Sequence, residues 1–393
     1  MISILDRSQP YSPAILLLDM PPSILCGIDL LSFTTTPAFH GFKDLPSGFH
    51  FIFSSETSSM SIRDGFWFHV PEISSTSHPP LIVRKWNAGE GCLVAVDDTE
   101  TYRGSLKELW EKGLAPYRQS ADKTSVSSPT DWEGLTEHIT PLVLENLTQS
   151  KVWSLTSASS AQVDTDSIPG ISEEEMGFKE RELGVLGIDL RRTWPEGAVG
   201  RERTDAAMDR SWALNDLVQK WQGGGGEWGA ILLGQMEACF LMVLTLANYS
   251  CMEEWKRCLG LVLRCRSAIR DHEAFFATFL TLLNKQLQRC EDVEGGLFDM
   301  SDGAGLLKSL LKGLKRILGR DFQNDEVTDV KEAMILLEDT LRKIYAWDLS
   351  DAFVRKGAME LEDGETVEMQ VDGMDEEDET GEYAPLIIDL EAG

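Results

Sequence analysis

Histidine is the residue type in this chain best suited to metal binding and to acid–base catalysis. The six histidines are His40, His50, His69, His78, His138 and His272. None forms a His-x-His or His-Glu-x-x-His pattern, which would bring two imidazoles to one ion. Because His50 lies in an aromatic, β-rich region, a metal-dependent enzyme in that region is one hypothesis. The spacing favours the alternative, a histidine hydrogen-bonded to a backbone carbonyl.

The seven cysteines, an odd number, include no Cys-x-x-Cys pair. Cys251, Cys258 and Cys265 recur every seven residues in a segment with helical periodicity, which places them along one side of a helix. At 1.5 Å per residue, the three thiols are spread over about 20 Å, too far apart to share a metal ion. We therefore expect buried core thiols and a reducing compartment.

Nucleophilic and phosphate-binding motifs are missing from the sequence. There is no Gly-x-Ser-x-Gly elbow, and no cysteine is matched to a particular histidine by its spacing. The run from Gly223 to Gly226 lacks the Lys and Ser/Thr that contact phosphate and Mg²⁺, so it predicts a link between helices. The sequence thus predicts no enzyme, no catalytic residue, no metal site and no cofactor.

Charge is distributed unevenly along the chain, which has 36 basic and 65 acidic residues and a net charge of −29. This balance argues against direct nucleic-acid binding, which needs clustered Lys and Arg. One predicted amphipathic helix is basic, with Lys308, Lys312, Lys315, Arg316 and Arg320. It could meet acidic partners or the protein's own tail, although a solvated helix face is the default interpretation.

The end of the chain combines an acidic tether with an apolar tip. Residues 357–393 contain fourteen Asp and Glu and no Lys or Arg, too hydrophilic a composition to fold alone. Residues 384–390 alternate like a β-strand, which can join the edge of a partner's sheet or return to its own domain. The candidate partner-binding residues are Tyr383, Ala384, Pro385, Leu386, Ile387, Ile388, Asp389 and Leu390.

The length of 393 residues and the 42% hydrophobic content leave room for about two domains. Residues 1–155 predict a β-rich sandwich or open barrel, antiparallel, with short helices at 106–114 and around Leu135, Ile139 and Leu142. Its strand candidates are residues 14–18, 49–53, 65–70, 81–86 and 92–96. The N-terminal residues lack the pattern of a secretory signal, and the apolar run 230–247 is interrupted by Gln235 and Glu237, which favours a buried helix over a membrane span.

The second half of the chain has helical periodicity. Residues 156–203 predict a linker, residues 204–350 an all-α domain, and residues 351–393 a disordered acidic tail that ends in the strand 384–390. The predicted helices are residues 205–221, 228–248, 250–269 with a Ser250–Glu253 capping box, 271–290, 306–318 and 327–347. The fold class is therefore α+β multidomain.

A set of short motifs occurs in order along nearly the whole chain. They are Leu18–Pro21, Gly27–Asp29, Phe39–Lys43, Pro46–Phe51, Gly65–Phe68, Val83–Trp86, Glu254–Arg257, Ala346–Asp348 and Ala384–Leu390. In these motifs the chain resembles the Aar-two family, cistron-splicing factors that act as assembly chaperones of the spliceosomal U5 snRNP. The chain departs from the family pattern in its Ser-rich insertion at 119–130, its linker after Thr156, its four-glycine run and its acidic tether.

The resemblance implies a β-rich N-terminal domain, a VHS-like helical domain and a C-terminal tail, without catalysis. It implies binding to the scaffold Prp-eight, at its RNase H-like and Jab/MPN-like domains, whose sheets the tail strand would join. It also implies that Brr-two helicase is kept off the scaffold during cytoplasmic assembly, with the nucleus as a further location. The alternatives are a metal-dependent enzyme in the β-rich domain and a generic helical adaptor protein.

Overall fold

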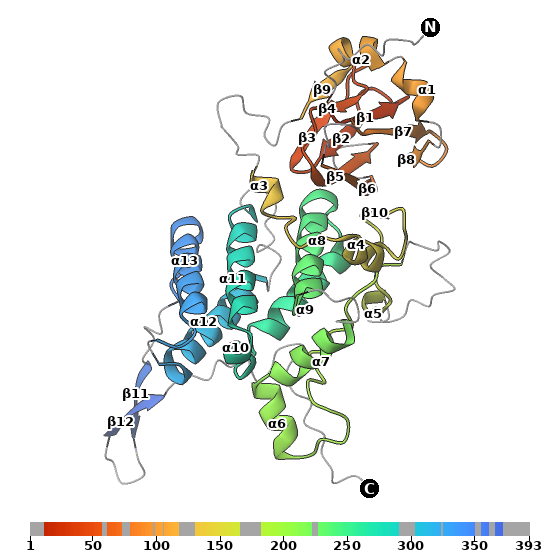
Figure 1. The fold of residues 1–393 in the computed structure, drawn as a ribbon. Coiled ribbons are helices and arrows are strands. Elements are labelled where there is room, and N and C mark those ends of the chain that lie inside the picture. The colour runs from red at the N-terminus through yellow and green to blue at the C-terminus, as the bar shows by residue number, and fades with distance from the viewer. Residues whose placement is uncertain are drawn as a thin grey trace. The chain divides into compact units, whose positions relative to one another are not determined.

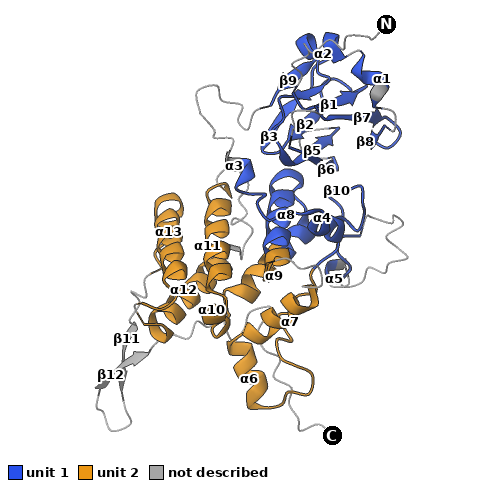
Figure 2. Ribbon diagram, in the orientation of Figure 1, with its two compact units in different colours: residues 1–185, 233–254 blue, residues 186–232, 255–393 orange. Residues whose placement is uncertain are grey.

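The computed structural model describes twelve stretches of the chain (Figure 1). They are residues 12–56, 61–72, 79–96, 99–104, 106–117, 130–165, 182–221, 227–290, 303–323, 325–349, 355–360 and 366–371. The chain divides into two compact units (Figure 2). The first unit comprises residues 1–185 and 233–254, and the second comprises residues 186–232 and 255–393.

The first unit contains two five-stranded sheets. The strand order β8-β7-β1-β4-β9 is formed by β1 (Ala14–Leu18), β4 (Gly41–Lys43), β7 (Leu81–Asn87), β8 (Cys92–Ala95) and β9 (Leu114–Pro116). The strand order β10-β6-β5-β2-β3 is formed by β2 (Leu25–Ile28), β3 (Leu31–Thr34), β5 (Gly48–Ser55), β6 (Asp64–Val70) and β10 (Ser154–Thr156). The five predicted strands are confirmed, and five shorter ones complete the sheets.

The two sheets share one apolar core, so the first unit contains a β-sandwich. Successive side chains of β1 point to opposite faces of its sheet. Ile15 and Leu17 join the core with Ile52 of the other sheet. Leu16 instead lies in a second apolar cluster with Leu106, which is the first residue of helix α2 (Leu106–Lys112). Burying such a side chain contributes about 1.5–3 kcal/mol to the free energy of folding. Alternate side chains of β1 therefore stabilise the packing on both faces of its sheet.

The prediction of an antiparallel arrangement is wrong for one of the two sheets. Strand β1 pairs in parallel with β7, with Ala14 opposite Leu81, and β4 pairs in parallel with β9. The strands β2, β3, β5 and β6 lie between β1 and β7 in sequence but belong to the other sheet. The chain therefore returns to the first sheet by a crossover, which allows parallel pairing.

Short helices complete the first unit. They are α1 (Glu100–Arg103), α2 (Leu106–Lys112), α3 (Thr130–Glu133), α4 (Pro141–Thr148) and α5 (Gln162–Thr165). The helix predicted around Leu135 and Ile139 is wrong, because α4 begins only at Pro141. The Thr140 hydroxyl accepts a hydrogen bond from the Val143 amide at 3.3 Å, and proline suits the first helical position, where no amide is needed.

Helices dominate the second unit. They are α6 (Arg201–Met208), α7 (Ser211–Trp221), α10 (Ala268–Asp271), α11 (Glu273–Leu287), α12 (Gly303–Asp321) and α13 (Thr328–Tyr345). Along the chain, α8 (Ala230–Leu246) and α9 (Tyr249–Val262) each contain residues of both units. The described residues thus confirm an α+β chain with an N-terminal β-sheet region and a C-terminal helical region.

Three details of the helix predictions are corrected. The predicted helix 205–221 is divided into α6 and α7, and the predicted helix 250–269 is divided into α9 and α10. The capping box is wrong as well, because Asn248 caps α9 by accepting a hydrogen bond from the Cys251 amide at 2.9 Å. The Ser250 hydroxyl is used elsewhere, since it accepts a hydrogen bond from the amide of Ala161.

Three features complete the description. In the acidic segment, β11 (Arg355–Glu360) and β12 (Thr366–Val371) pair as an antiparallel hairpin that the sequence analysis did not predict. In the segment predicted as a linker, Leu183, Leu186 and Leu190 are buried. Within the described stretches, no helix combines the length and the apolarity that crossing a membrane requires.

Candidate functional site

His50, the candidate metal ligand, is buried in strand β5 beside a buried carboxylate. Its Nδ1 atom lies 2.7 Å from Asp29 Oδ2, and its Nε2 atom lies 3.0 Å from the carbonyl oxygen of Pro46. The Tyr117 hydroxyl donates to the same Asp29 oxygen at 2.6 Å, and the Phe51 amide donates to Asp29 Oδ1 at 2.8 Å. Asp29 is thus the centre of a four-residue cluster in the sandwich.

This geometry favours the charged form of His50. A carboxylate and a carbonyl oxygen both accept hydrogen bonds, so the two contacts are satisfied together when both ring nitrogens carry protons, as in the imidazolium. Burial opposes the charged form, but the charge of Asp29 and the hydrogen bonds to Asp29 and Pro46 outweigh it and raise the pKa of His50. Neither nitrogen has a lone pair for a metal ion, so the carbonyl-bonded histidine is confirmed and this site does not fit a metal.

A second buried carboxylate, Glu237, organises the contact between α8 and the segment before α4. Its Oε2 atom accepts a hydrogen bond from the His138 amide at 2.8 Å, and its Oε1 atom lies 2.8 Å from His138 Nδ1. Burial raises the pKa of Glu237, and this effect outweighs the hydrogen bonds from His138, which would lower it. The Gln235 side chain donates to the Gly184 carbonyl at 3.0 Å. The two polar interruptions of the apolar run therefore fasten two chain segments to α8.

The seven cysteines are all buried and none of them forms a disulfide, which confirms the prediction of core thiols for Cys251, Cys258 and Cys265. Burial raises the pKa of the Cys26 thiol to about 12 and that of the Cys290 thiol to about 12. Thiolate is the reactive form of cysteine, so the raised pKa makes Cys26 and Cys290 poor nucleophiles and poor metal ligands.

We expect the native protein to resist alkylation. At about pH 8, a thiol with a pKa near 12 has roughly a thousandfold less thiolate than an ordinary cysteine, and burial also blocks access. Iodoacetamide should therefore leave the folded chain unmodified over minutes, whereas the denatured chain should gain seven adducts, as intact mass would show. Fast modification of any single cysteine in the folded chain would contradict this assignment.

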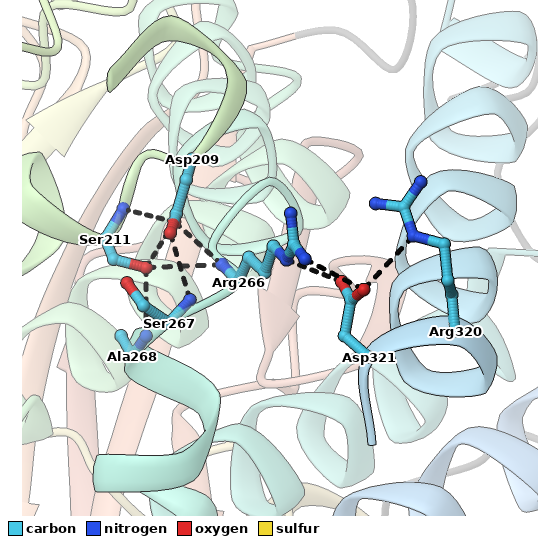
Figure 3. Close-up of polar contacts among 7 residues, drawn as sticks. All are labelled: Asp209, Ser211, Arg266, Ser267, Ala268, Arg320 and Asp321. Atoms are coloured by element: carbon cyan, nitrogen blue, oxygen red, sulfur yellow. Dashed lines mark hydrogen bonds and ion pairs between the residues drawn. The ribbon is translucent and has the colours of Figure 1, made fainter. Parts of the chain in front are cut away.

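The helical unit contains a polar cluster centred on Asp209, the residue that follows the end of α6 (Figure 3). Asp209 Oδ1 accepts hydrogen bonds from the Ser211 hydroxyl at 2.5 Å and from the Arg266 amide at 2.8 Å. Asp209 Oδ2 accepts one from the Ser267 amide at 3.1 Å, and Ser211 Oγ accepts one from the Ala268 amide at 3.0 Å. These bonds tie the α6–α7 junction to the start of α10.

The same cluster reaches α12 through the side chain of Arg266 (Figure 3). Its guanidinium forms a two-point ion pair with Asp321, with Nε 2.6 Å from Oδ2 and a second nitrogen 2.9 Å from Oδ1. Arg320 also donates to Asp321 at 3.1 Å. Because no histidine contacts Ser211 or Asp209 in the described contacts, this cluster holds helices together and offers no activated nucleophile.

Helix α12 is amphipathic, and its polar side is basic although the chain as a whole is acidic. Its buried side is apolar, formed by Leu307, Leu310, Leu311, Leu314 and Leu318. Its opposite side carries Lys308, Lys312, Arg316 and Arg320 at intervals of four residues, which places them along one line of the helix. We call these four residues the basic stripe. Lys315 lies at its border and donates to Glu338 of α13 at 2.8 Å.

The residues predicted to bind a partner, 383–390, lie outside the described residues. On the described helical unit, Ile335 and Leu336 of α13 are 62% and 61% exposed, the kind of adjacent apolar pair that protein partners cover. Across the described stretches, no group of three or more His, Cys, Asp and Glu side chains is placed to hold a metal ion. The described polar clusters therefore stabilise the fold.

Comparison with known proteins agrees with this organisation. Residues 11–149 match a family model described as the AAR2 N-terminal domain, and residues 186–350 match the AAR2 C-terminal repeat region. The chain belongs to the AAR2 family. The resemblance to the Aar-two family is thereby confirmed, and AAR2 membership implies a splicing-related factor of the U5 snRNP.

Several curated AAR2 relatives match most of the chain. Protein AAR2 homolog of Mus musculus is 25% identical over 307 residues, which cover 70% of this chain and 74% of the relative. Protein AAR2 homolog of Homo sapiens is 24% identical over 303 residues, with 70% and 74% covered. Protein AAR2 homolog of Caenorhabditis elegans is 24% identical over 313 residues, with 73% and 82% covered.

Proposed function

We propose that this AAR2 family member is a non-enzymatic splicing factor that chaperones assembly of the U5 snRNP. It binds the scaffold Prp-eight at the RNase H-like and Jab/MPN-like domains, partly by adding its C-terminal strand, and delays binding of the Brr-two helicase. The observation that carries this proposal is the match of both AAR2 regions within one chain. We place this step in the cytoplasm, with the nucleus as a further location.

The chemistry of the described residues supports a binding role. His50 and His138 are each hydrogen-bonded to a buried carboxylate, and the cysteines are buried. A helical adaptor for other partners is the competing proposal. A pull-down in which the chain showed no preference for Prp-eight among spliceosomal proteins would favour that adaptor.

The terminal strand is expected to depend on the folded units for its affinity. Ordering seven residues from Ala384 to Leu390 costs roughly 7–14 kcal/mol at about 1–2 kcal/mol each. Burying the four aliphatic side chains of this segment returns roughly 6–12 kcal/mol, and ladder hydrogen bonds add about 0.5–1.5 kcal/mol each. These terms nearly balance, so the strand alone binds weakly and the complex can later be released.

Removal of the terminal strand is expected to weaken binding to the Prp-eight C-terminal domains at least about tenfold, which corresponds to about 1.4 kcal/mol. The measurement is titration calorimetry with the full chain and with a truncation that ends at Thr380. A truncation that ends at Leu390 is the matched control, because it keeps the strand and should bind like the full chain. Equal binding of all three proteins would remove the strand from the interface.

A further inference from the structure

Between residues 308 and 320 the basic stripe of α12 has no acidic side chain among its cations, and the Arg320 end of the stripe is paired with the adjacent Asp321. Like charges four residues apart repel each other, and α12 contains no acidic residue between them. The other residues on this side of the helix are Gly305, Ser309, Gly313 and Gly319. Glycine is a poor helix former, so this side adds little stability to α12 by itself.

The described part of the chain leaves this side of α12 open. A Cβ atom added at Gly305, Gly313 or Gly319 would meet no atom within 4 Å. Lys308 and Lys312 form no ion pair with any residue that the structure describes. The stripe can therefore accept an anionic chain at close range, with glycine positions that let a backbone approach between the cations.

The chemistry that complements four regularly spaced cations is a run of carboxylates. Residues 372–393 contain nine Asp and Glu and no Lys or Arg, and five of them, Asp375 to Glu379, are consecutive. Because this run is tethered to the helical unit, its local concentration exceeds that of any acidic partner in solution. The net charge of −29 also repels external anions, including nucleic acids, at long range.

The register of α12 and α13 brings the end of α13 level with the first residue of the stripe. Lys331 donates to the Phe322 carbonyl at 3.3 Å, and Lys315 donates to Glu338 at 2.8 Å. From the first contact to the second, the residue number on the α12 side falls by seven, from 322 to 315. On α13 it rises by seven, from 331 to 338. The two helices are therefore antiparallel. The same register, continued by seven residues, brings Lys308 level with Tyr345, the last residue of α13.

The length of chain between the fold and the acidic run is sufficient. The stripe extends over twelve residues, from 308 to 320, or about 18 Å of helix. With the β11–β12 hairpin paired, ten residues lie outside it, six from 349 to 354 and four from 372 to 375. Ten residues span up to roughly 33 Å, which is more than the stripe requires.

We propose that the carboxylates of Asp375–Glu379 dock on the basic stripe of α12, and that this contact holds the tail with its terminal strand against the helical unit of its own chain. The proposal is independent of the identity of the partner. It gives the tail two states, held and released, and predicts that salt shifts the tail toward release because exposed ion pairs are screened.

The test follows the amide NMR signals of residues 372–382 in the full chain. In the wild-type protein these signals should be broad in about 0.1 M salt and at least about twofold narrower in about 1 M salt. The variant Lys308→Glu/Lys312→Glu/Arg316→Glu should give narrow signals at both concentrations. The matched variant Lys107→Glu/Lys112→Glu/Lys151→Glu reverses three exposed cations of the first unit and should behave like wild type.

Narrow, salt-independent signals in the wild-type protein would overturn the proposal, as would equal effects of the two variants. A second measurement needs no variant and so does not depend on whether one folds. Carbodiimide, which joins adjacent amines and carboxylates, should link Lys308 or Lys312 to a carboxylate between 372 and 391. The Lys315–Glu338 pair provides the internal positive control. Recovery of that link without any link to the tail would also overturn the proposal.

Discussion

Replacement of Asp29 by asparagine is expected to lower the free energy of unfolding of the β-sandwich by about 3 kcal/mol, because it leaves the buried imidazolium of His50 without its counter-ion. Asparagine keeps the size of the side chain and tolerates the left-handed backbone of this position, where φ is 54°. The measurement is hydrogen exchange at the amides of β2 and β5, which reports the local opening free energy. Unchanged protection there would show that the pair does not stabilise the sandwich.

Asp44→Asn is the matched control for this substitution. Asp44 also has a positive φ, 61°, but its side chain is exposed and accepts a hydrogen bond only from Ser12 among the described contacts. An exposed substitution of this kind should change stability by no more than about 0.5 kcal/mol. An equal loss in both variants would attribute the Asp29 effect to backbone conformation and not to charge.

The cost of Asp29→Asn should also depend on pH. The pKa of His50 is raised in the folded protein, so the stabilisation from its charged form is fully present below the unfolded value of about 6.5. It is lost as pH rises through the higher folded pKa. The two proteins should therefore differ most near pH 6, and the difference in their free energies of unfolding should shrink as pH rises through the folded pKa of His50.

Replacement of Asp209 by alanine is expected to lower the free energy of unfolding of the helical unit by about 2 kcal/mol. The change removes the acceptor for the amides of Arg266 and Ser267 and for the hydroxyl of Ser211. The loss should be smaller than the sum of the three hydrogen-bond energies, because water can reach the amides of Arg266 and Ser267 and partly replace the carboxylate. Hydrogen exchange at the start of α7 and in α10 should locate the loss.

Asp205→Ala supplies the control, since Asp205 is exposed on α6 and forms only a surface ion pair with Arg201 in the described contacts. It should change stability by about 0.5 kcal/mol or less.

The contribution of Asp209 should also depend on pH. The hydrogen bonds to Asp209 outweigh the burial of its carboxyl group and lower the pKa of Asp209. Its contribution is therefore present above the unfolded value of about 4 and is lost as pH falls through the folded pKa.

Periodicity predicted the elements whose apolar side chains have a regular pattern. Strands such as β5 and β7, and helices such as α12 and α13, lie within a few residues of their predicted positions. The breaks between α6 and α7 and between α9 and α10 were missed. They depend on Asp209 accepting hydrogen bonds from residues more than fifty positions away, and local patterns do not contain such contacts.

The partners of the buried carboxylates also could not be predicted, because they are far away in the sequence. His50 was singled out from the sequence, but its partner Asp29 was not, because only the fold brings residues 21 positions apart together. A signal was present, since Asp29 and His50 both lie in motifs that carry the resemblance to the family. Glu237 was noticed as an interruption of an apolar run, although its contact with His138 could not be inferred from spacing.

The order of segments in the first unit has a consequence for synthesis on the ribosome. This unit is completed by residues 233–254, which are translated after residues 186–232 of the other unit. At about 5–20 residues per second, the 69 residues from 185 to 254 take roughly 3–14 s to translate. Until then the nascent chain presents the backbone of His138 and the side chain of Val143, which later contact α8, without their cover. The packing of α8 against His138 and Val143 can therefore form only after residues 186–232 of the other unit have been translated.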